Sequence, residues 1–470
     1  MNYIHTNADG QMEFSQESHS FLMIPSTLKG FNNTDTTTKT SRSGRTVYSF
    51  NGELEDDMDR TCPYCQSKMH VNNHIDVNLR HLNFGGALTA VQFRKLQLRC
   101  PHCGTTAMQE IPFKAEHHRI TKELYTYVED LLTLGKYTNR QVGQLTGLDE
   151  NTVKAIDKRR LEKKYTVNGK KLIQPEATTP ILGIDEFKLH NGYRYATHII
   201  DMQTGHILWI SHGKKKQVVY DFIDHVGLDW MESVEAVACD MNSDFQEAFE
   251  ERCPHIQPVF DRFHIVRNFN EKVIAEVRKD EQRRLDEEGD KEAAKSLKRA
   301  RYILTSSRET LNRKDQEARD GKVLSKGSEL FCKEEVVRKD GHMDKYEAII
   351  EQNKLLFTAD LIKEKLADAY GKDNEPEMAK DMTEIMELCS ATGNKHFLWF
   401  RNLIDKHFEG IIAHATYQIT SGKVEGINNK IKTLRRQGYG YPDDEYFFLK
   451  LFDASRNDYV RNTPSHKILE

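Results

Sequence analysis

Four of the eight cysteines occur in two pairs with the spacing of metal ligands, and 34 residues separate the pairs. These four are Cys62, Cys65, Cys100 and Cys103. Each Cys-x-x-Cys turn offers two thiolates, and Zn²⁺ takes four ligands at the corners of a tetrahedron. The pattern therefore predicts a zinc ribbon that holds one structural zinc ion. Because the usual separation is about 15–20 residues, His70, His74 and His81 stay open as substitute ligands.

Two acidic residues follow apolar runs that are typical of buried strands, and a third lies on an amphipathic helix. The first two are Asp185 and Asp240, and the third is Glu425. Carboxylate oxygens are the hard ligands that Mg²⁺ prefers in proteins. The sequence therefore predicts a divalent-metal site formed by these three acids. Lys432 and Arg435 follow Glu425 on one helix face, where we expect them to hold a DNA backbone.

A run of short helices before residue 170 ends in a basic one. Thr138 begins a capping-box pattern, Gly147 suits a turn, and Asp149 suits the N-cap of a third helix. In that helix Val153 and Ile156 are predicted to point inward. The residues left outward, where a recognition helix meets DNA, are Asn151, Thr152, Lys154, Lys158 and Arg159. The pattern predicts a DNA-binding helix-turn-helix, with a plain helical bundle as the alternative.

The elements that must position the acids follow one another in a recognisable order. A three-strand meander is followed by a helix, a strand, a helix and a last strand. The predicted ranges are 181–184, 193–200, 206–211, 217–226, 234–239, 245–251 and 258–260. This is the order of a ribonuclease-H-like sheet, in which the first and fourth strands are neighbours. Asp185 and Asp240 are therefore expected to face one another at the strand ends.

The predicted fold class is multidomain α/β. It combines a zinc ribbon, a helix-turn-helix and a ribonuclease-H-like catalytic domain that is interrupted by a long all-helical insertion. The predicted boundaries are a weakly packed segment at 1–59, the ribbon at 60–113, the helix-turn-helix at 116–172, the first catalytic part at 178–264, the insertion at 265–415, and the last catalytic part with the Glu425 helix at 416–470.

Composition narrows the class of protein. The 470 residues include 72 acids and 68 Lys and Arg residues, which gives a net charge of −4. This excludes binding to nucleic acid through bulk charge, so DNA contacts must come from local basic patches. No window approaches the about 18 apolar residues of a membrane helix, and the first residues do not resemble a secretory signal. We expect a cytoplasmic protein without membrane contact.

Between about Cys62 and Phe452 the chain resembles the ISL-three family of bacterial insertion-sequence transposases. The motifs that carry the resemblance are Cys62-Pro63-Tyr64-Cys65, Cys100-Pro101-His102-Cys103-Gly104, Arg119-Ile120-Thr121, Gly183-Ile184-Asp185-Glu186, Cys239-Asp240-Met241-Asn242, Asp261-Arg262-Phe263-His264 with Asn268, Val424 to Lys432, and Tyr439-Gly440-Tyr441. The resemblance implies an Asp-Asp-Glu transposase that acts on the terminal inverted repeats of its element and on target DNA. It also implies that the helical insertion contacts DNA ends.

In such a transposase two Mg²⁺ ions, or Mn²⁺ in their place, lie on either side of the scissile phosphate, about 3.5–4 Å apart. The resemblance implies Asp185 as the bridging ligand, with Asp240 and Glu425 each holding mainly one ion. Asp261 is left outside the trio, either supporting it or simply ending a strand. We expect a homodimer or a larger assembly on DNA.

Two other functions remain open from the sequence. One is a regulator with a zinc ribbon and a helix-turn-helix, derived from a transposase but without catalysis. The other is a nuclease of the same fold that cuts DNA without joining it. The aromatic run from His396 to Phe400 is predicted to be helical core, with base stacking as its alternative.

Overall fold

The computed structural model describes residues 5–6, 12–13, 28–41, 44–190, 194–241, 243–298, 300–325, 330, 334–419, 422–438 and 440–456. The chain divides into two compact units, Met1–Ile173 with Leu434–Glu470, and Gln174–Thr433. None of the helices in these described segments is long and apolar enough to cross a lipid bilayer.

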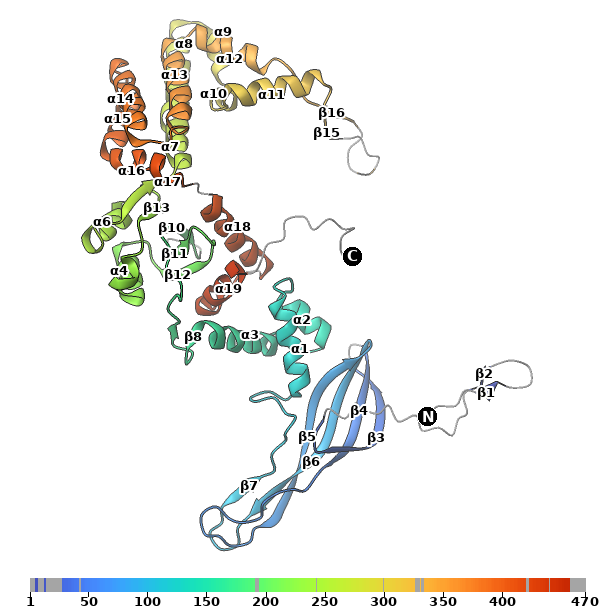
Figure 1. The fold of residues 1–470 in the computed structure, drawn as a ribbon. Helices are drawn as coiled ribbons and strands as arrows, with labels where there is room; N and C mark the ends of the chain where they lie inside the picture. Colours follow the sequence, from blue (N-terminus) through green and yellow to red (C-terminus); the bar gives the residue numbers. More distant parts are fainter. Residues whose placement is uncertain are drawn as a thin grey trace. The chain divides into compact units, whose positions relative to one another are not determined.

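The first unit contains a five-stranded sheet in the order β3-β4-β6-β5, with β7 paired to β6 (Figure 1). Its strands are β3 (Phe31–Thr40), β4 (Thr46–Leu54), β5 (His70–Phe84), β6 (Ala87–Arg99) and β7 (Thr106–Met108). The pair β4–β6 is parallel, whereas β3–β4 and β5–β6 are antiparallel. Two short strands, β1 (His5–Thr6) and β2 (Met12–Glu13), pair separately. The long insert between the cysteine pairs is therefore the β5–β6 hairpin.

The prediction of a weakly packed segment at 1–59 is wrong for β3 and β4. Strand β3 lies at the edge of the sheet, so it needs few apolar side chains. Phe31 supplies the main apolar contact, with its ring centroid 5.9 Å from that of Phe93 and 6.0 Å from that of Phe113. Strand β3 is also rich in threonine, a β-branched residue that strands favour.

Three helices follow the sheet in the first unit: α1 (Lys122–Thr133), α2 (Asn139–Thr146) and α3 (Glu150–Tyr165). The predicted caps are present: Thr138 forms a capping box with Gln141, Gly147 adopts a left-handed φ of 73°, and Asp149 caps α3. Val153 and Ile156 are fully buried in the core that the three helices share. The short strands β8 (Thr166–Val167) and β9 (Lys171–Leu172) follow α3.

Helix α19 (Asp444–Arg456) packs on α3 within the first unit, through buried ionic contacts. The fully buried Asp157 carboxylate accepts hydrogen bonds from Tyr446 at 2.6 Å and from Lys450 at 2.7 Å. Arg160 lies between Asp157 and Asp453, at 2.8 and 3.0 Å. Removing one partner from such a buried group typically costs about 3–5 kcal/mol. These contacts therefore hold α19 firmly against α3.

This packing corrects the predicted last domain. We expected residues 416–470 to complete the catalytic domain, but Leu434–Glu470 cluster with the first unit. The division falls within α18 (Gly422–Gln437), so only the first part of that helix belongs to the second unit. Tyr446, Lys450 and Asp453 share one face of α19, but their spacing does not identify α3 as the partner, because that depends on tertiary contact.

The second unit contains a five-stranded sheet in the order β12-β11-β10-β13-β14. Its strands are β10 (Ile181–Lys188), β11 (Tyr195–Asp201), β12 (Ile207–His212), β13 (Ala236–Cys239) and β14 (Gln257–Phe260). The first three are antiparallel neighbours, and β13 and β14 run parallel to β10. Three helices join these strands, namely α4 (Lys216–Val226), α5 (Leu228–Met231) and α6 (Ser243–Arg252).

The predicted strand order is present, but β10 extends further than expected. Asp185 lies within the strand, because residues up to Lys188 still pair with β11. The parallel pairing with β13 ends at Gly183↔Ala238, so Asp185 and Asp240 each lie two residues beyond that pair. The second predicted strand began at Tyr193, which lies outside the described residues.

Residues between β14 and α18 form the insertion, drawn from green to red in Figure 1. Its elements are α7 (Arg262–Asn268), the π-helix η1 (Phe269–Ile274), α8 (Ala275–Glu288), α9 (Lys291–Lys298), α10 (Arg301–Leu304), α11 (Arg308–Arg319), α12 (His342–Glu351), α13 (Lys354–Ala369), α14 (Glu375–Ala391), α15 (Lys395–Lys406), α16 (Phe408–Ile412) and α17 (His414–Tyr417). The all-helical prediction needs one correction, since β15 (Val323–Ser325) and β16 (Val336–Val337) form a small hairpin. In α15, Phe397 and Phe400 are buried as predicted, whereas Trp399 is exposed.

Candidate metal centres and nucleic-acid interface

The four paired cysteines converge at one end of the β5–β6 hairpin. His70 pairs with Arg99 in the register of that hairpin, which brings the turn before β5 beside the turn after β6. The ligand atoms of all four cysteines lie within 4.8 Å of one another. Three sulfur–sulfur distances are 3.5, 3.4 and 3.5 Å, for Cys62–Cys103, Cys65–Cys100 and Cys65–Cys103. Tetrahedral zinc with Zn–S bonds of about 2.3 Å needs sulfur atoms about 3.8 Å apart, so these residues fit the ion.

The substitute ligands left open by the sequence are not part of this cluster, which the four cysteines make up by themselves. His81 is buried and its Nδ1 lies 2.9 Å from the Thr121 hydroxyl. His70 and His74 are exposed on β5. Thr105 hydrogen-bonds the Cys103 sulfur at 3.1 Å and lowers the pKa of that thiol to about 6, which favours the thiolate form that zinc binds.

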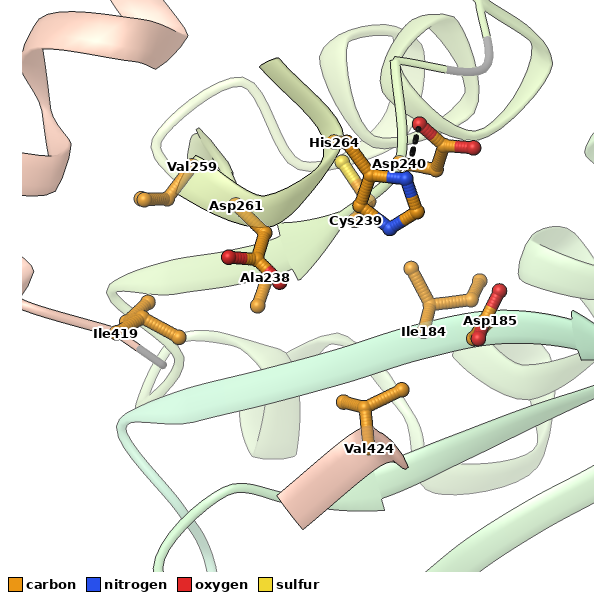
Figure 2. A pocket seen from close by; sticks show the side chains of 10 residues that line it. All are labelled: Ile184, Asp185, Ala238, Cys239, Asp240, Val259, Asp261, His264, Ile419 and Val424. Carbon is orange, nitrogen blue, oxygen red and sulfur yellow. Dashed lines mark ion pairs between the residues drawn. The ribbon is translucent and has the colours of Figure 1, made fainter. Parts of the chain in front are cut away.

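A pocket at the edge of the second sheet contains Asp185 and Asp240, as Figure 2 shows. The Asp185 carboxylate accepts a hydrogen bond of 2.6 Å from Nδ2 of Asn428 on α18 and another of 2.8 Å from the Glu186 amide. Burial raises the pKa of Asp185, while the hydrogen bonds from Asn428 and the Glu186 amide oppose the rise. The neighbouring charge of Asp240 also raises it. A bound cation would reverse both effects by favouring the charged carboxylates.

Asp240 has a second neighbour, His264 on α7. The His264 Nδ1 lies 3.5 Å from the Asp240 Oδ1, the contact dashed in Figure 2. Asp261 caps α7 through a 2.9 Å hydrogen bond from the Phe263 amide, and its other carboxylate oxygen has no hydrogen-bond partner within the described parts of the chain. The same holds for one side-chain oxygen of Glu186 and of Asn428. Several unpaired oxygens beside two carboxylates form an environment that suits a hard divalent cation.

The helix that carries Glu425 packs directly on β10. Gly183 permits the close approach, since a Cβ there would lie 2.6 Å from Met202 Sδ and 3.1 Å from Val424 Cγ2. Lys423 donates to the Met202 carbonyl oxygen at 2.7 Å. Glu425 itself lies exposed in the first turn of α18. Ser421 directly precedes α18 and is of a type that favours the N-cap position, but it lies outside the described residues.

The structure brings Asp185 and Asp240 to one pocket but does not gather the three acids into a tight cluster. Among the described residues, only the four cysteines form a group of three or more metal-ligating side chains whose ligand atoms lie within 4.8 Å of one another. Glu425 therefore stays a predicted ligand. Lys432 is exposed on α18, and Arg435 is half-buried one turn later. Asn428 and His264 gain contacts to the acids that the sequence did not predict, because such contacts join elements far apart in the chain.

The basic residues of α3 differ from their prediction. Lys154 and Lys158 were expected to face solvent, but each lies 3.2 Å from Oδ2 of Asp443, just before α19. Arg159 pairs with Glu116 at 3.1 Å. Asn151 is exposed and Thr152 is half-buried at the start of α3. The acid that neutralises the two lysines is nearly 300 residues away in sequence, which is why helix periodicity missed it.

A family model described as a transposase, of the Asp-Asp-Glu ISL-three type, matches residues 182–451. The match covers more than half of the chain, so this protein belongs to the ISL-three family of transposases. A second model, described as the zinc-finger of transposase IS204/IS1001/IS1096/IS1165, matches residues 59–103 and defines an N-terminal zinc ribbon. The predicted family is thereby confirmed.

Curated relatives agree with the family. The chain is 26% identical over 356 residues to the transposase for insertion sequence element IS1001 of Bordetella parapertussis, which covers 76% of this chain and 78% of that protein. It is 23% identical over 382 residues to the transposase for insertion sequence element IS1557 of Mycobacterium tuberculosis, covering 77% and 78% of the two chains.

Proposed function

We propose that this protein binds the terminal inverted repeats of an insertion sequence and catalyses metal-dependent DNA cleavage and strand transfer. The observation that carries the proposal is the pocket shared by Asp185 on β10 and Asp240, which directly follows the parallel neighbour β13. Family membership supports the reaction class. The strand order β12-β11-β10-β13-β14 supports a ribonuclease-H-like catalytic domain.

Asp185, Asp240 and Glu425 would hold two Mg²⁺ ions. When bound, the ions would activate the attacking oxygen and stabilise the leaving oxygen at the scissile phosphate. Asn428 orients the Asp185 carboxylate through its 2.6 Å hydrogen bond. His264 lies close enough to Asp240 to orient that carboxylate. Lys432 and Arg435, further along α18, would contact the DNA backbone.

Helices α2 and α3 support a helix-turn-helix that recognises double-stranded DNA, because a capped short helix, a left-handed glycine and a capped third helix follow in order. Asn151, Thr152 and Arg159 are the α3 residues that we expect to reach bases and phosphates. Lys154 and Lys158 would join them only after giving up Asp443. The protein would act in the bacterial cytoplasm as a homodimer or larger assembly on nucleoid DNA.

Asp443→Asn is expected to tighten binding to end DNA severalfold at low salt. The change removes the charge that competes with phosphate for Lys154 and Lys158, while asparagine can keep the 3.1 Å hydrogen bond from the Tyr446 amide. Because each new phosphate contact adds about −0.9 to the slope of log K against log salt, the slope should become steeper by about one to two. Gel-shift titrations at several salt concentrations measure both quantities.

Glu445→Gln is the matched control. It also removes one negative charge close to Asp443 in sequence, but the Glu445 side chain is exposed. Equal tightening by Glu445→Gln would mean that overall charge, and not the Asp443 contact, limits binding. Unchanged binding by Asp443→Asn would remove the two lysines from the proposed DNA surface.

Incubating the purified protein with labelled end DNA, a target plasmid and Mg²⁺ tests the proposed function. Cleaved ends that become joined to the plasmid are expected. Cleavage without joining would indicate a nuclease of the same fold, and binding without cleavage would indicate a regulator. Sequencing the DNA around the gene adds a check that needs no protein, because terminal inverted repeats flanked by short direct duplications are expected there.

A further inference from the structure

A second pocket, here called the side pocket, adjoins the carboxylate pocket within the second unit. The two pockets share Asp261 and Ile419 as lining residues. The side pocket has a volume of about 520 Å³, within the range of about 300–1,000 Å³ that is typical of pockets for small organic groups. The lining residues used below are Arg262, Phe263, Tyr370, Lys372 and His414.

The inner wall of the side pocket contains polar atoms without partners. Tyr370 is 6% exposed and His414 is 8% exposed, and their ring centroids lie 5.0 Å apart in an edge-to-face arrangement. Among the residues that the structure describes, the Tyr370 hydroxyl and the His414 Nδ1 have no hydrogen-bond partner. Buried polar atoms are rarely left unpaired. These two are therefore placed to hydrogen-bond a group that enters the pocket.

The outer part of the side pocket combines an exposed aromatic ring with two cations. Phe263 is 56% exposed, and the Arg262 guanidinium lies 5.9 Å from the Tyr370 ring centroid. Lys372 is only loosely paired, at 3.6 Å from Glu377 and 3.9 Å from Asp381. The outer part therefore suits an anion beside a flat ring.

Charge separates the two parts of the side pocket. Asp261 lies near both His414 and Tyr370, and its carboxylate disfavours an anion at the inner wall. A neutral group with hydrogen-bonding edges suits that wall better. An aromatic base that carries a phosphate meets both requirements, since bases stack on aromatic side chains in a sequence-tolerant way.

We propose that the side pocket binds one unpaired nucleotide of the DNA end, next to the phosphate that is cut. Its base would stack on Phe263 and hydrogen-bond Tyr370 and His414, and its phosphate would lie at Arg262 and Lys372. This assignment rests on the proposed function, because DNA must reach the neighbouring carboxylates. Enzymes that act on DNA commonly hold an extruded nucleotide in such a pocket.

Cleavage of end DNA that carries single abasic sites near the cut tests the assignment. Removing one particular base should slow cleavage by the wild-type protein about tenfold, since one stacked base is lost. Phe263→Ala should slow cleavage of intact DNA to a similar extent, and Tyr370→Phe about fivefold through the lost hydrogen bond. In both variants the abasic site should add little further loss, because protein and DNA changes remove the same contact.

Phe357→Ala is the matched control. Phe357 is 54% exposed on another helix of the same unit, so this variant should cleave DNA like the wild type. Additive losses at every abasic position would overturn the assignment while leaving the proposed function intact, and would mean that water fills the side pocket.

A readout that needs no cleavage separates the two proposals. End DNA with 2-aminopurine at each position near the cut is bound in Ca²⁺, and one position should change its fluorescence with the wild type and Phe357→Ala but not with Phe263→Ala. If the wild type binds but never cuts, the proposed function fails and this signal still decides the nucleotide assignment. If no position shows this change in fluorescence, the nucleotide assignment is overturned.

Discussion

Asp185→Asn, Asp240→Asn and Glu425→Gln are each expected to reduce Mg²⁺-dependent cleavage of end DNA by about a thousandfold or more. Each substitution keeps the shape of the side chain and removes a charge that holds a divalent ion. A metal ion stabilises transition-state charge by several kcal/mol, and each 1.36 kcal/mol corresponds to about tenfold in rate. Binding of end DNA in Ca²⁺ should stay nearly unchanged, because the proposed DNA contacts come from α3, Lys432 and Arg435 and not from the acids.

Three further substitutions serve as controls for the loss of cleavage. Asp229→Asn changes an exposed acid on α5 and should leave cleavage unchanged. Glu186→Gln and Asp261→Asn alter acids beside the trio and should cost much less than the trio itself. Near-normal cleavage by Glu425→Gln would assign the third ligand to another residue. Normal cleavage by all three variants of the trio would refute the active site.

Glu425 is the most informative of the three, because its position depends most on tertiary structure. Strand order alone predicts that Asp185 and Asp240 are neighbours, since parallel strands bring equivalent ends to one edge of a sheet. The position of α18 depends instead on the small residue Gly183 and on the Asn428–Asp185 hydrogen bond. Neither has a local signature in the sequence, so the helix could be predicted but not the contact that places it.

The first unit shows the same limit. Caps at Thr138, Gly147 and Asp149 are local features, and sequence patterns predicted them correctly. The pairing of β4 with β6 and the packing of α19 on α3 join segments far apart in the chain. Asp157 illustrates the reason: its spacing of four residues from Val153 places it on the buried face of α3, but only the partners from α19 make the burial of its charge favourable.

Replacing Cys100 and Cys103 together with serine is expected to reduce bound zinc from one ion per chain to none. Two remaining thiolates supply only half of the tetrahedral set, and zinc bound by structural sites contributes about 10–16 kcal/mol in small fingers. Elemental analysis of the purified full-length protein measures the zinc content. His70→Ala and His74→Ala are controls from the same hairpin and should keep the ion, since neither side chain belongs to the cluster.

In the Cys100/Cys103 double variant, the loss of ordered structure should be confined to the turns that carry the cysteines. Arg80 fixes the other end of the hairpin, with hydrogen bonds of 2.6 Å to the Thr89 carbonyl oxygen and 3.1 Å to the Thr146 carbonyl oxygen of α2. Hydrogen exchange in the double variant should therefore accelerate around residues 60–70 and 99–106, while α1–α3 keep their protection. Unchanged zinc in the double variant, or loss of zinc in His70→Ala, would refute the four-cysteine site. Exchange that accelerates through α3 as well would mean that zinc stabilises the proposed DNA-binding helices, and not the ribbon alone.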